Sequence, residues 1–102
     1  MTEPPSASDF DEAVEEVIVR LGRGEVVTYG WVALEAGFPG RHRGVGTFLA
    51  RRYGGPNWWR VVDSGGRLRA PSVSEQAQRL RAEGVQVVDD RVRGTVKRPQ
   101  MR

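Results

Sequence analysis

The spacing of apolar residues along the chain predicts four amphipathic helices. Between residues 10 and 21, apolar side chains recur at every third or fourth position, which places them on one face of a helix. Similar spacing predicts helices over residues 29–36, 41–52 and 73–82. Because each apolar stripe must be covered, we expect these helices to pack around one modest core.

Capping residues and glycines indicate where these helices begin and end. Asp9 and Thr28 have side-chain oxygens that can cap the first and second helices, and Ser72 with Glu75 forms a capping box before the fourth. A Phe-Pro-Gly turn at residues 38–40 joins the second helix to the third. Two helices joined by so short a turn are typical of a helix-turn-helix, with the second of the two as recognition helix.

Short extended segments and the chain ends complete the predicted organisation. Residues 60–62 and 85–88 have the β-branched composition of short strands. We expect one domain over residues 9–88, preceded by a disordered leader at residues 1–8 and followed by a charged, flexible tail at residues 89–102. The predicted fold class is α/β, mostly α, in a winged-helix-like arrangement.

Composition narrows the chemistry available to the chain. The 102 residues include no cysteine and a single histidine, His42, which argues against disulfides, thiolate chemistry and a metal site. We therefore expect neither a metal nor a cofactor. No apolar run approaches the ~18 residues of a membrane span, so a membrane is not an expected partner.

The charge is unevenly distributed along the sequence. Residues 1–16 carry six acids and no base, whereas the remainder carries all 16 bases, 15 of them arginine, against seven acids. Residues 41–69 hold seven arginines and one acid, Asp63. Arginine suits phosphates and base edges, so the pattern fits a nucleic-acid footprint, but a solvated arginine-rich surface would look the same. The acidic leader is either solvated chain or an arm that docks a partner.

The middle of the chain contains glycines and tryptophans at positions where fold stability alone does not explain them. Gly44 and Gly46 lie inside the third predicted helix, where each costs roughly 1 kcal/mol relative to alanine. That cost suggests a backbone held close to a neighbouring helix or to a DNA strand. Trp58 and Trp59 stand side by side after a Gly-Gly-Pro-Asn turn, and each is either a core residue or a contact for a ligand.

Ordered motifs over roughly residues 22–88 resemble a known family. The stretch VVTYGWVALEAGFPGRHRGVGTFLARRYGGPNWWRVVDSGGRL is similar to the DNA-binding domain of O6-alkylguanine-DNA alkyltransferases, and SEQAQRLRAEGVQV is similar to its closing helix and strand. The shared features are a tyrosine that opens one helix, an Arg-x-Val-Gly turn that opens the next, and the region of the family's Pro-Cys-His-Arg-Val motif. The resemblance implies a helix-turn-helix that enters the minor groove of DNA.

The chain departs from this family at the reactive motif. Asn57-Trp58-Trp59-Arg60 stands in place of Pro-Cys-His-Arg, so Trp58 occupies the position of the nucleophilic cysteine. An indole has no free nucleophilic lone pair and cannot accept an alkyl group as a thiolate does. In this respect the chain resembles the alkyltransferase-like proteins, which bind O6-alkylguanine in DNA without repairing it and flag it for nucleotide excision repair.

The resemblance implies a role for several individual residues. Tyr29 would rotate the target nucleotide out of the helix, and Arg43 would enter the base stack and pair with the orphaned cytosine. Trp58 would form the wall against which the flipped guanine stacks. Glu83 matches a glutamate that orients the family's histidine, so here it either accepts a hydrogen bond from Trp59 or faces solvent.

Two sets of site residues follow from the resemblance. The expected DNA-binding residues are Tyr29, Gly30, Arg41, His42, Arg43, Gly46 and Ser64. The expected alkylguanine pocket consists of Tyr29, Leu49, Trp58, Arg60, Arg69 and Ser72. Spacing from Trp58 puts Pro71 where relatives carry a pocket arginine, and Arg69 is the candidate substitute.

The function expected is therefore non-enzymatic recognition of DNA damage. A monomer would bind and flip O6-alkylguanine in double-stranded DNA, in the cytoplasm of a bacterium and associated with its nucleoid, and nucleotide excision repair proteins such as a UvrA-type damage sensor would detect the complex. Two alternatives stay open: an active alkyltransferase, and a sequence-specific winged-helix regulator that prefers an undamaged site. The preferred alkyl groups and the docking repair factor stay open as well.

Overall fold

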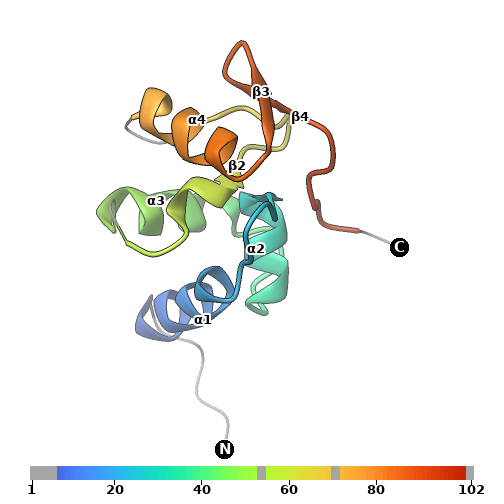
Figure 1. Ribbon diagram of the computed structural model, residues 1–102. Coiled ribbons are helices and arrows are strands. Elements are labelled where there is room, and N and C mark those ends of the chain that lie inside the picture. Colours follow the sequence, from blue (N-terminus) through green and yellow to red (C-terminus); the bar gives the residue numbers. More distant parts are fainter. Residues whose placement is uncertain (1–6, 53–54, 70–71, 101–102) are drawn as a thin grey trace, which may run out of the picture.

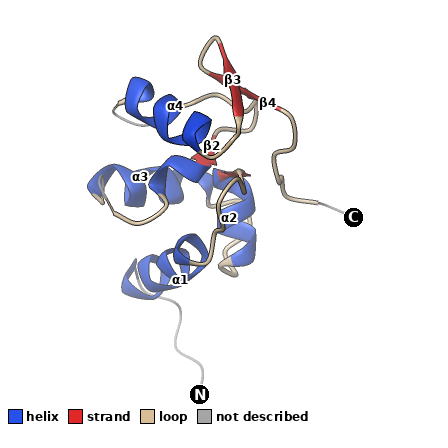
Figure 2. Ribbon diagram, viewed as in Figure 1, coloured by secondary structure: helices blue, strands red, loops and turns tan. Residues whose placement is uncertain are grey.

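The structure consists mainly of helices, together with a few short strands. The computed structural model describes residues 7–52, 55–69 and 72–100 (Figures 1 and 2). The elements, in chain order, are α1 (Ala7–Val19), β1 (Val27–Thr28), α2 (Tyr29–Glu35), α3 (His42–Arg51), the 3₁₀ helix η1 (Trp58–Arg60), β2 (Val61–Val62), α4 (Val73–Ala82), β3 (Gln86–Val88) and β4 (Arg91–Arg93). The mostly helical class predicted from the sequence is confirmed.

The first helix begins earlier than its capping pattern indicated. Asp9, expected as the N-cap, lies within the first turn of α1, where its negative charge still favours the positive end of the helix dipole. The apolar stripe is as predicted, because Phe10, Val14 and Ile18 are all buried. Of the expected leader, residues 1–6 lie outside the described residues.

Helices α2 and α3 form the predicted helix-turn-helix. The hydroxyl of Thr28 accepts a hydrogen bond of 3.0 Å from the Trp31 backbone N–H, so Thr28 caps α2 as expected. The chain then turns through Gly37 and Gly40, both with positive φ, and α3 follows. The two helices pack closely against each other below β2 in Figure 1, and α1 lies against α2.

A two-stranded parallel sheet links the two halves of the domain. Val27 pairs with Val61 and Thr28 pairs with Val62, and all four side chains are buried. Neighbouring residues of a strand face opposite sides. Val27 and Val61 accordingly join the apolar cluster of α1, α2 and α3, whereas Val62 joins a second cluster with Leu80. The single core expected from the sequence is thus two clusters on either side of one small sheet.

The expected domain boundary at residue 88 is displaced toward the C-terminus. β3 and β4 form an antiparallel hairpin, with Asp89 and Asp90 at its turn in left-handed conformations (φ 53° and 58°). Beyond it Val96 is buried, and Lys97 pairs with the backbone of β1 through Thr28 N–H to Lys97 O and Lys97 N–H to Val26 O. Residues 89–100 therefore pack on the domain, although they were expected to be a separate charged tail.

A buried ion pair holds η1 against α4. Arg60 and Glu83 meet at 2.7 Å, and the Trp59 indole N–H donates to the same carboxylate, also at 2.7 Å. Arg60 Nη1 donates further to Leu21 O and to Asn57 Oδ1. Arg60 was expected in a strand and in the alkylguanine pocket; it ends the 3₁₀ helix instead, because its guanidinium is committed to these buried partners.

The surroundings of Glu83 keep its carboxyl group ionised. Burial by itself raises the pKa of Glu83. Hydrogen bonds from Arg60, from the Gly24 backbone N–H and from Trp59 outweigh it and lower the pKa from 4.5 to about 2. The contribution of this carboxylate to stability is therefore fully present above about pH 4.5 and is lost as the pH falls toward 2.

Replacing Glu83 by Gln should destabilise the fold at neutral pH by about 3 kcal/mol, because it leaves Arg60 buried without its counter-charge. The same variant should show a weaker loss of stability between about pH 4.5 and 2 than the wild type. Urea denaturation followed by tryptophan fluorescence across that pH range measures both effects. An equal acid response in the two proteins would contradict the role given to Glu83.

Candidate nucleic-acid interface

One cavity gathers most of the residues expected to bind DNA. It has a volume of about 630 Å³ and lies at the first residues of α2 and α3, beside the loop after β2 and the C-terminal segment. Its described lining residues are Thr28, Tyr29, Gly30, His42, Arg43, Asp63, Ser64, Arg69, Arg98 and Pro99. Tertiary structure thus brings together six residues that the sequence analysis selected from three separate stretches.

Tyr29 presents a neutral phenol at this cavity. The side chain is half-buried, and burial raises its pKa; a nearby Arg69 lowers it and Asp63 raises it again. The phenol therefore keeps its proton at neutral pH. Within the described residues its hydroxyl has no hydrogen-bond partner, so it is free to donate to a bound phosphate.

The start of α3 offers positive charge that the protein itself does not neutralise. His42 and Arg43 are exposed, and the side chain of Arg43 makes no ion pair, hydrogen bond or ring contact with the described residues. The N-cap residue, Arg41, does not cap the helix with its side chain and stacks instead on Phe10, with Cζ 5.0 Å from the ring centre. Free N–H groups and the helix dipole at this end favour an anion.

The two glycines of α3 turn out to serve different purposes. A Cβ at Gly44 would stand 2.9 Å from Cζ of Phe10, so this glycine lets α1 approach α3. At Gly46, by contrast, no described atom lies within 4 Å of the corresponding position. Gly44 therefore allows a neighbouring helix to approach, which is the first of the two explanations considered from the sequence. Gly46 leaves the backbone of α3 accessible to a binding partner.

Asp63 organises the loop on the far side of the cavity. Its Oδ1 accepts hydrogen bonds from the backbone N–H groups of Gly65 and Arg67, at 2.9 and 2.8 Å. Its Oδ2 lies 3.9 Å from Nε of Arg69, which is exposed and lines the cavity. This acid thus holds the loop that carries Ser64, and it leaves most of the Arg69 guanidinium directed to solvent.

Trp58 and Leu49 lie along a different cavity. It has a volume of about 70 Å³, well below the ~300 Å³ at which ligand pockets usually begin. Trp58 is only 5% exposed, and its ring meets that of Trp59 edge to face. In this structure Trp58 is a packed residue between α1 and α3, and it is not among the described residues that line the larger cavity.

Three further expected site residues lie outside both cavities. Arg60 belongs to the buried network described above. Ser72 caps α4, because its hydroxyl accepts a hydrogen bond from the Glu75 N–H at 3.2 Å, as the capping box predicted. Arg41 lies on Phe10. Pro71, the position at which relatives carry an arginine, lies outside the described residues.

The expected site residues did not include four of the lining residues, Thr28, Asp63, Arg98 and Pro99, and the last two had no role at all in the sequence analysis. Pro99 packs on Gly30, where an added Cβ would stand 3.0 Å from its Cγ. Arg98 donates from Nε to the Ser64 backbone oxygen at 3.0 Å. No local signal marks these residues, because their position depends on pairing with β1 across some 70 residues of chain.

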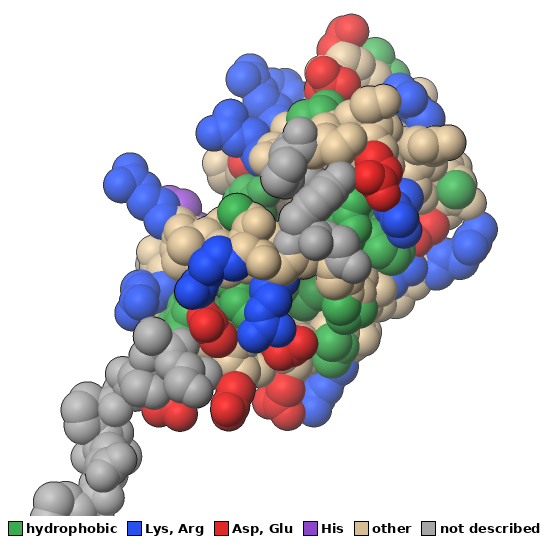
Figure 3. Space-filling model, turned by 90° about the vertical axis from the view of Figure 1, so that its left-hand side faces the viewer, with side chains coloured by type: hydrophobic (Ala, Val, Ile, Leu, Met, Phe, Trp, Pro, Cys, Tyr) green, Lys and Arg blue, Asp and Glu red, His purple; other side chains and the backbone are tan. Residues whose placement is uncertain are grey.

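On the face shown in Figure 3 charge is unevenly distributed, although acidic side chains also lie at its top and basic ones on its right-hand side. Lys and Arg side chains follow the left-hand edge of Figure 3, on the same side as the histidine, whereas acidic side chains gather along the lower edge.

Among the described residues no group of three or more His, Cys, Asp or Glu side chains could hold a metal ion. None of the described helices is both long enough and apolar enough to span a membrane.

A helix-turn-helix with a basic cavity at its recognition helix defines a DNA-binding domain, and comparison with known proteins identifies the family. Residues 9–85 match the family described as 6-O-methylguanine DNA methyltransferase, DNA binding domain. The chain belongs to this family. With Trp58 at the cysteine position, it is an alkyltransferase-like member.

Individual relatives support this assignment. A DNA base-flipping protein of Vibrio parahaemolyticus is 40% identical over 75 residues, which cover 70% of this chain and 75% of the relative. The protein of the same name in Escherichia coli K12 is 40% identical over 82 residues, 76% of this chain and 64% of the relative.

Solved structures agree with the sequence relatives. Schizosaccharomyces pombe Atl1, in complex with damaged DNA containing O6-carboxymethylguanine, is similar with a TM-score of 0.70 and 28% identity, over 86% of this chain and 83% of that one. The O6-methylguanine methyltransferase of Mycobacterium tuberculosis is similar with a TM-score of 0.64 and 26% identity, over 74% of this chain and 48% of that one.

The two glycines of α3 should respond oppositely to alanine. Gly46→Ala should stabilise the protein by about 0.5–1 kcal/mol, because the added methyl group meets no described atom and alanine favours a helix. Gly44→Ala should destabilise it, because Phe10 must move. Thermal unfolding measures both, and a Gly44→Ala protein as stable as the wild type would contradict the packing described.

Proposed function

We propose that this protein binds duplex DNA containing O6-alkylguanine, rotates the damaged nucleotide out of the helix, and holds it without transferring the alkyl group. The observation that carries the proposal is the cavity of about 630 Å³, which joins the phenol of Tyr29, the unpaired Arg43 and the loop of Ser64 and Arg69. Its volume falls within the ~300–1,000 Å³ usual for ligand pockets. The similarity to a DNA base-flipping protein, and to Atl1 in complex with damaged DNA, supports the same function.

In this proposal each side of the cavity has a separate task. The uncapped N-terminus of α3 and His42 bind the phosphate backbone. Gly46 allows the minor-groove wall to approach α3 closely, because no described side chain stands over it. Arg43 enters the stack and donates two parallel hydrogen bonds to the orphaned cytosine, and Tyr29 presses on the phosphate of the rotated nucleotide.

Arg69 faces the space that the rotated base would enter. Its side chain is 63% exposed, and Nε lies 3.9 Å from Asp63 Oδ2, so the guanidinium can stack on a base or attract the electron-rich O6 substituent while this carboxylate holds its inner end. In this proposal Arg69 takes the place of the pocket arginine of the relatives. Ser64 contributes its hydroxyl at the edge of the same loop.

In this proposal the bound DNA stays unrepaired because the protein offers no acceptor for the alkyl group. The printed chain has no cysteine, and the residue at the reactive position, Trp58, has an indole nitrogen that donates hydrogen bonds and is not nucleophilic. A persistent complex is then the output. We propose that nucleotide excision repair proteins of the UvrA type recognise it, and that the protein acts as a monomer.

A competition experiment tests the proposal as a whole. Two duplexes of one sequence, one plain and one with a single O6-methylguanine, should compete unequally for the protein, with at least roughly ten-fold tighter binding of the methylated duplex (about 1.4 kcal/mol). Label on the methyl group should stay on the DNA. Equal affinity would reject damage recognition and favour a sequence-specific regulator, and label on the protein would reveal an alkyltransferase.

Arg43→Ala should weaken binding of the methylated duplex by roughly ten- to a hundred-fold, because a charge-assisted contact is worth about 1.5–3 kcal/mol. Tyr29→Phe should reduce nucleotide rotation, seen as a smaller rise in fluorescence from 2-aminopurine placed beside the lesion. Arg20→Ala is the matched control, since Arg20 is an exposed arginine that faces Glu16 on α1. If Arg43→Ala binds like this control, Arg43 does not enter the stack.

A further inference from the structure

The C-terminal hairpin lies beyond the family match at residues 9–85, and the segment that follows it lines the cavity through Arg98 and Pro99. β4 pairs on its free side with the loop after β2, through Val92 N–H to Gly66 O at 2.9 Å and Leu68 N–H to Asp90 O at 3.0 Å. The segment after the hairpin then pairs with β1 at Lys97. The loop after β2 thus holds the hairpin, and β1 holds the segment that follows the hairpin.

One face of this small sheet consists largely of arginines. Arg67 stands directly opposite Arg91, and directly opposite residues of paired strands point to the same face. Arg93 lies two positions along β4 and shares that face, whereas Val87 and Val92 between them are buried. Like charges placed opposite each other destabilise a sheet, so this arrangement favours a partner that is itself negatively charged.

These arginines are free to bind such a partner. Within the described part of the chain, Arg67, Arg91 and Arg93 make no ion pair, hydrogen bond from the side chain, or ring contact. In this they resemble Arg43, and they differ from Arg51 and Arg52, which face carboxylates of α1. The hairpin turn itself carries two acids, Asp89 and Asp90, and in the loop that pairs with β4 Asp63 is already bonded to the Gly65 N–H and lies beside Arg69.

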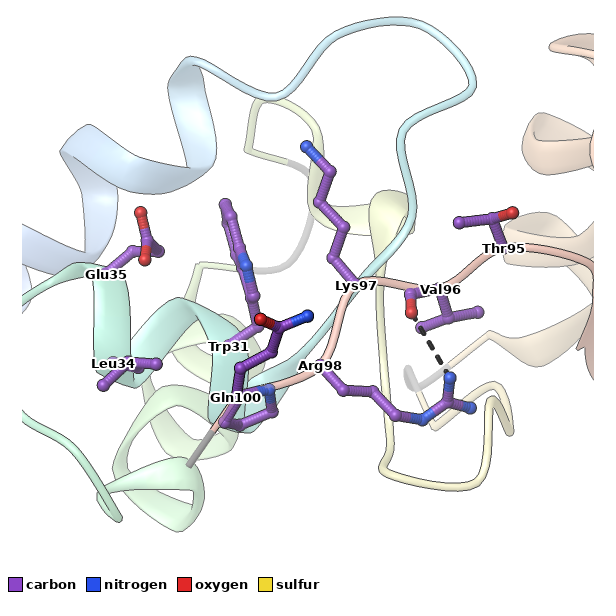
Figure 4. Close-up of a pocket in the computed structure, with 9 residues that line it drawn as sticks. Trp31, Leu34, Glu35, Thr95, Val96, Lys97, Arg98 and Gln100 are labelled. Atoms are coloured by element: carbon purple, nitrogen blue, oxygen red, sulfur yellow. Dashed lines mark hydrogen bonds between the residues drawn. The ribbon is translucent and has the colours of Figure 1, made fainter. Parts of the chain in front are cut away.

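Arg98 connects this face to the cavity. Figure 4 shows Lys97 and Arg98 leaving the C-terminal segment in opposite directions, with Lys97 toward Trp31 and Arg98 away from it. Arg98 reaches the Ser64 carbonyl and lines the cavity. Residues 64–69 and 86–100 together hold six bases against two acids, and Lys and Arg side chains gather at the upper left of Figure 3, above the histidine.

We infer that the β3–β4 hairpin and Arg67 form a second DNA-contacting element, which binds phosphates of the duplex to one side of the cavity. The inference rests on the proposed function, since DNA is the partner in both. The hairpin reads no base: its arginines strengthen binding of damaged and undamaged duplexes alike and extend the length of duplex that the protein covers.

The double variant Arg91→Gln/Arg93→Gln tests the inference on the full chain. It should bind plain and O6-methylated duplexes equally less well, by roughly ten-fold at about 0.1 M salt, and the plot of log affinity against log salt should be shallower by about 1–2. The ratio of the two affinities should stay that of the wild type. The wild type should also lose affinity when the duplex is shortened to the part over the cavity, and the variant should not.

Arg20→Gln/Arg51→Gln is the matched control, because it removes the same charge from two exposed arginines that face acids of α1. If the hairpin variant binds both duplexes like this control, the inference is overturned, and the arginine face is left to an acidic protein. A wild type without preference for the methylated duplex would reject lesion recognition alone, because the hairpin effect on plain duplex is measured independently of it.

Discussion

The buried carboxylate of Glu83 is the interaction on which the arrangement of this domain depends. It binds Arg60 and Trp59 of η1 and the backbone N–H of Gly24, so that three segments distant in sequence meet at one charge. Arg60 in turn holds Leu21 O at the end of α1. Burying a charge costs free energy unless its hydrogen-bonding and ionic partners are all present. The network therefore stabilises a single position of η1.

The consequences reach the cavity through the backbone. Val61 and Val62 directly follow η1 and pair with β1 in the parallel sheet. β1 ends at Thr28, and this residue caps α2. The first residue of α2 is Tyr29. The position of the phenol proposed to rotate the nucleotide is therefore set by a salt bridge on the other side of the small sheet.

The alkyltransferase family uses the corresponding region for a cysteine and a histidine, and here two tryptophans take their place. Trp58 lies beside Leu49 and Phe48, and Trp59 donates a hydrogen bond to Glu83. Both stabilise the scaffold, while the polar groups that face the cavity come from α2, α3 and the loop of Asp63. The proposed recognition of a damaged base rests on these cavity groups and not on the two tryptophans.

The sequence by itself determined the helices, the caps at Thr28 and Ser72 and the family, because helical periodicity and capping are local properties and the family motifs are contiguous. It also selected Tyr29, Arg43, Ser64 and Arg69, which the structure places around one cavity. Only the tertiary structure decided that Arg60 is buried in an ion pair, that Gly44 rather than Gly46 accommodates Phe10, and that residues 89–100 pack on the domain. A strand of two or three residues is not stable by itself, and a buried charge is stable only beside its counter-charge. The positions of these strands and charges therefore depend on contacts with residues that are distant in the sequence.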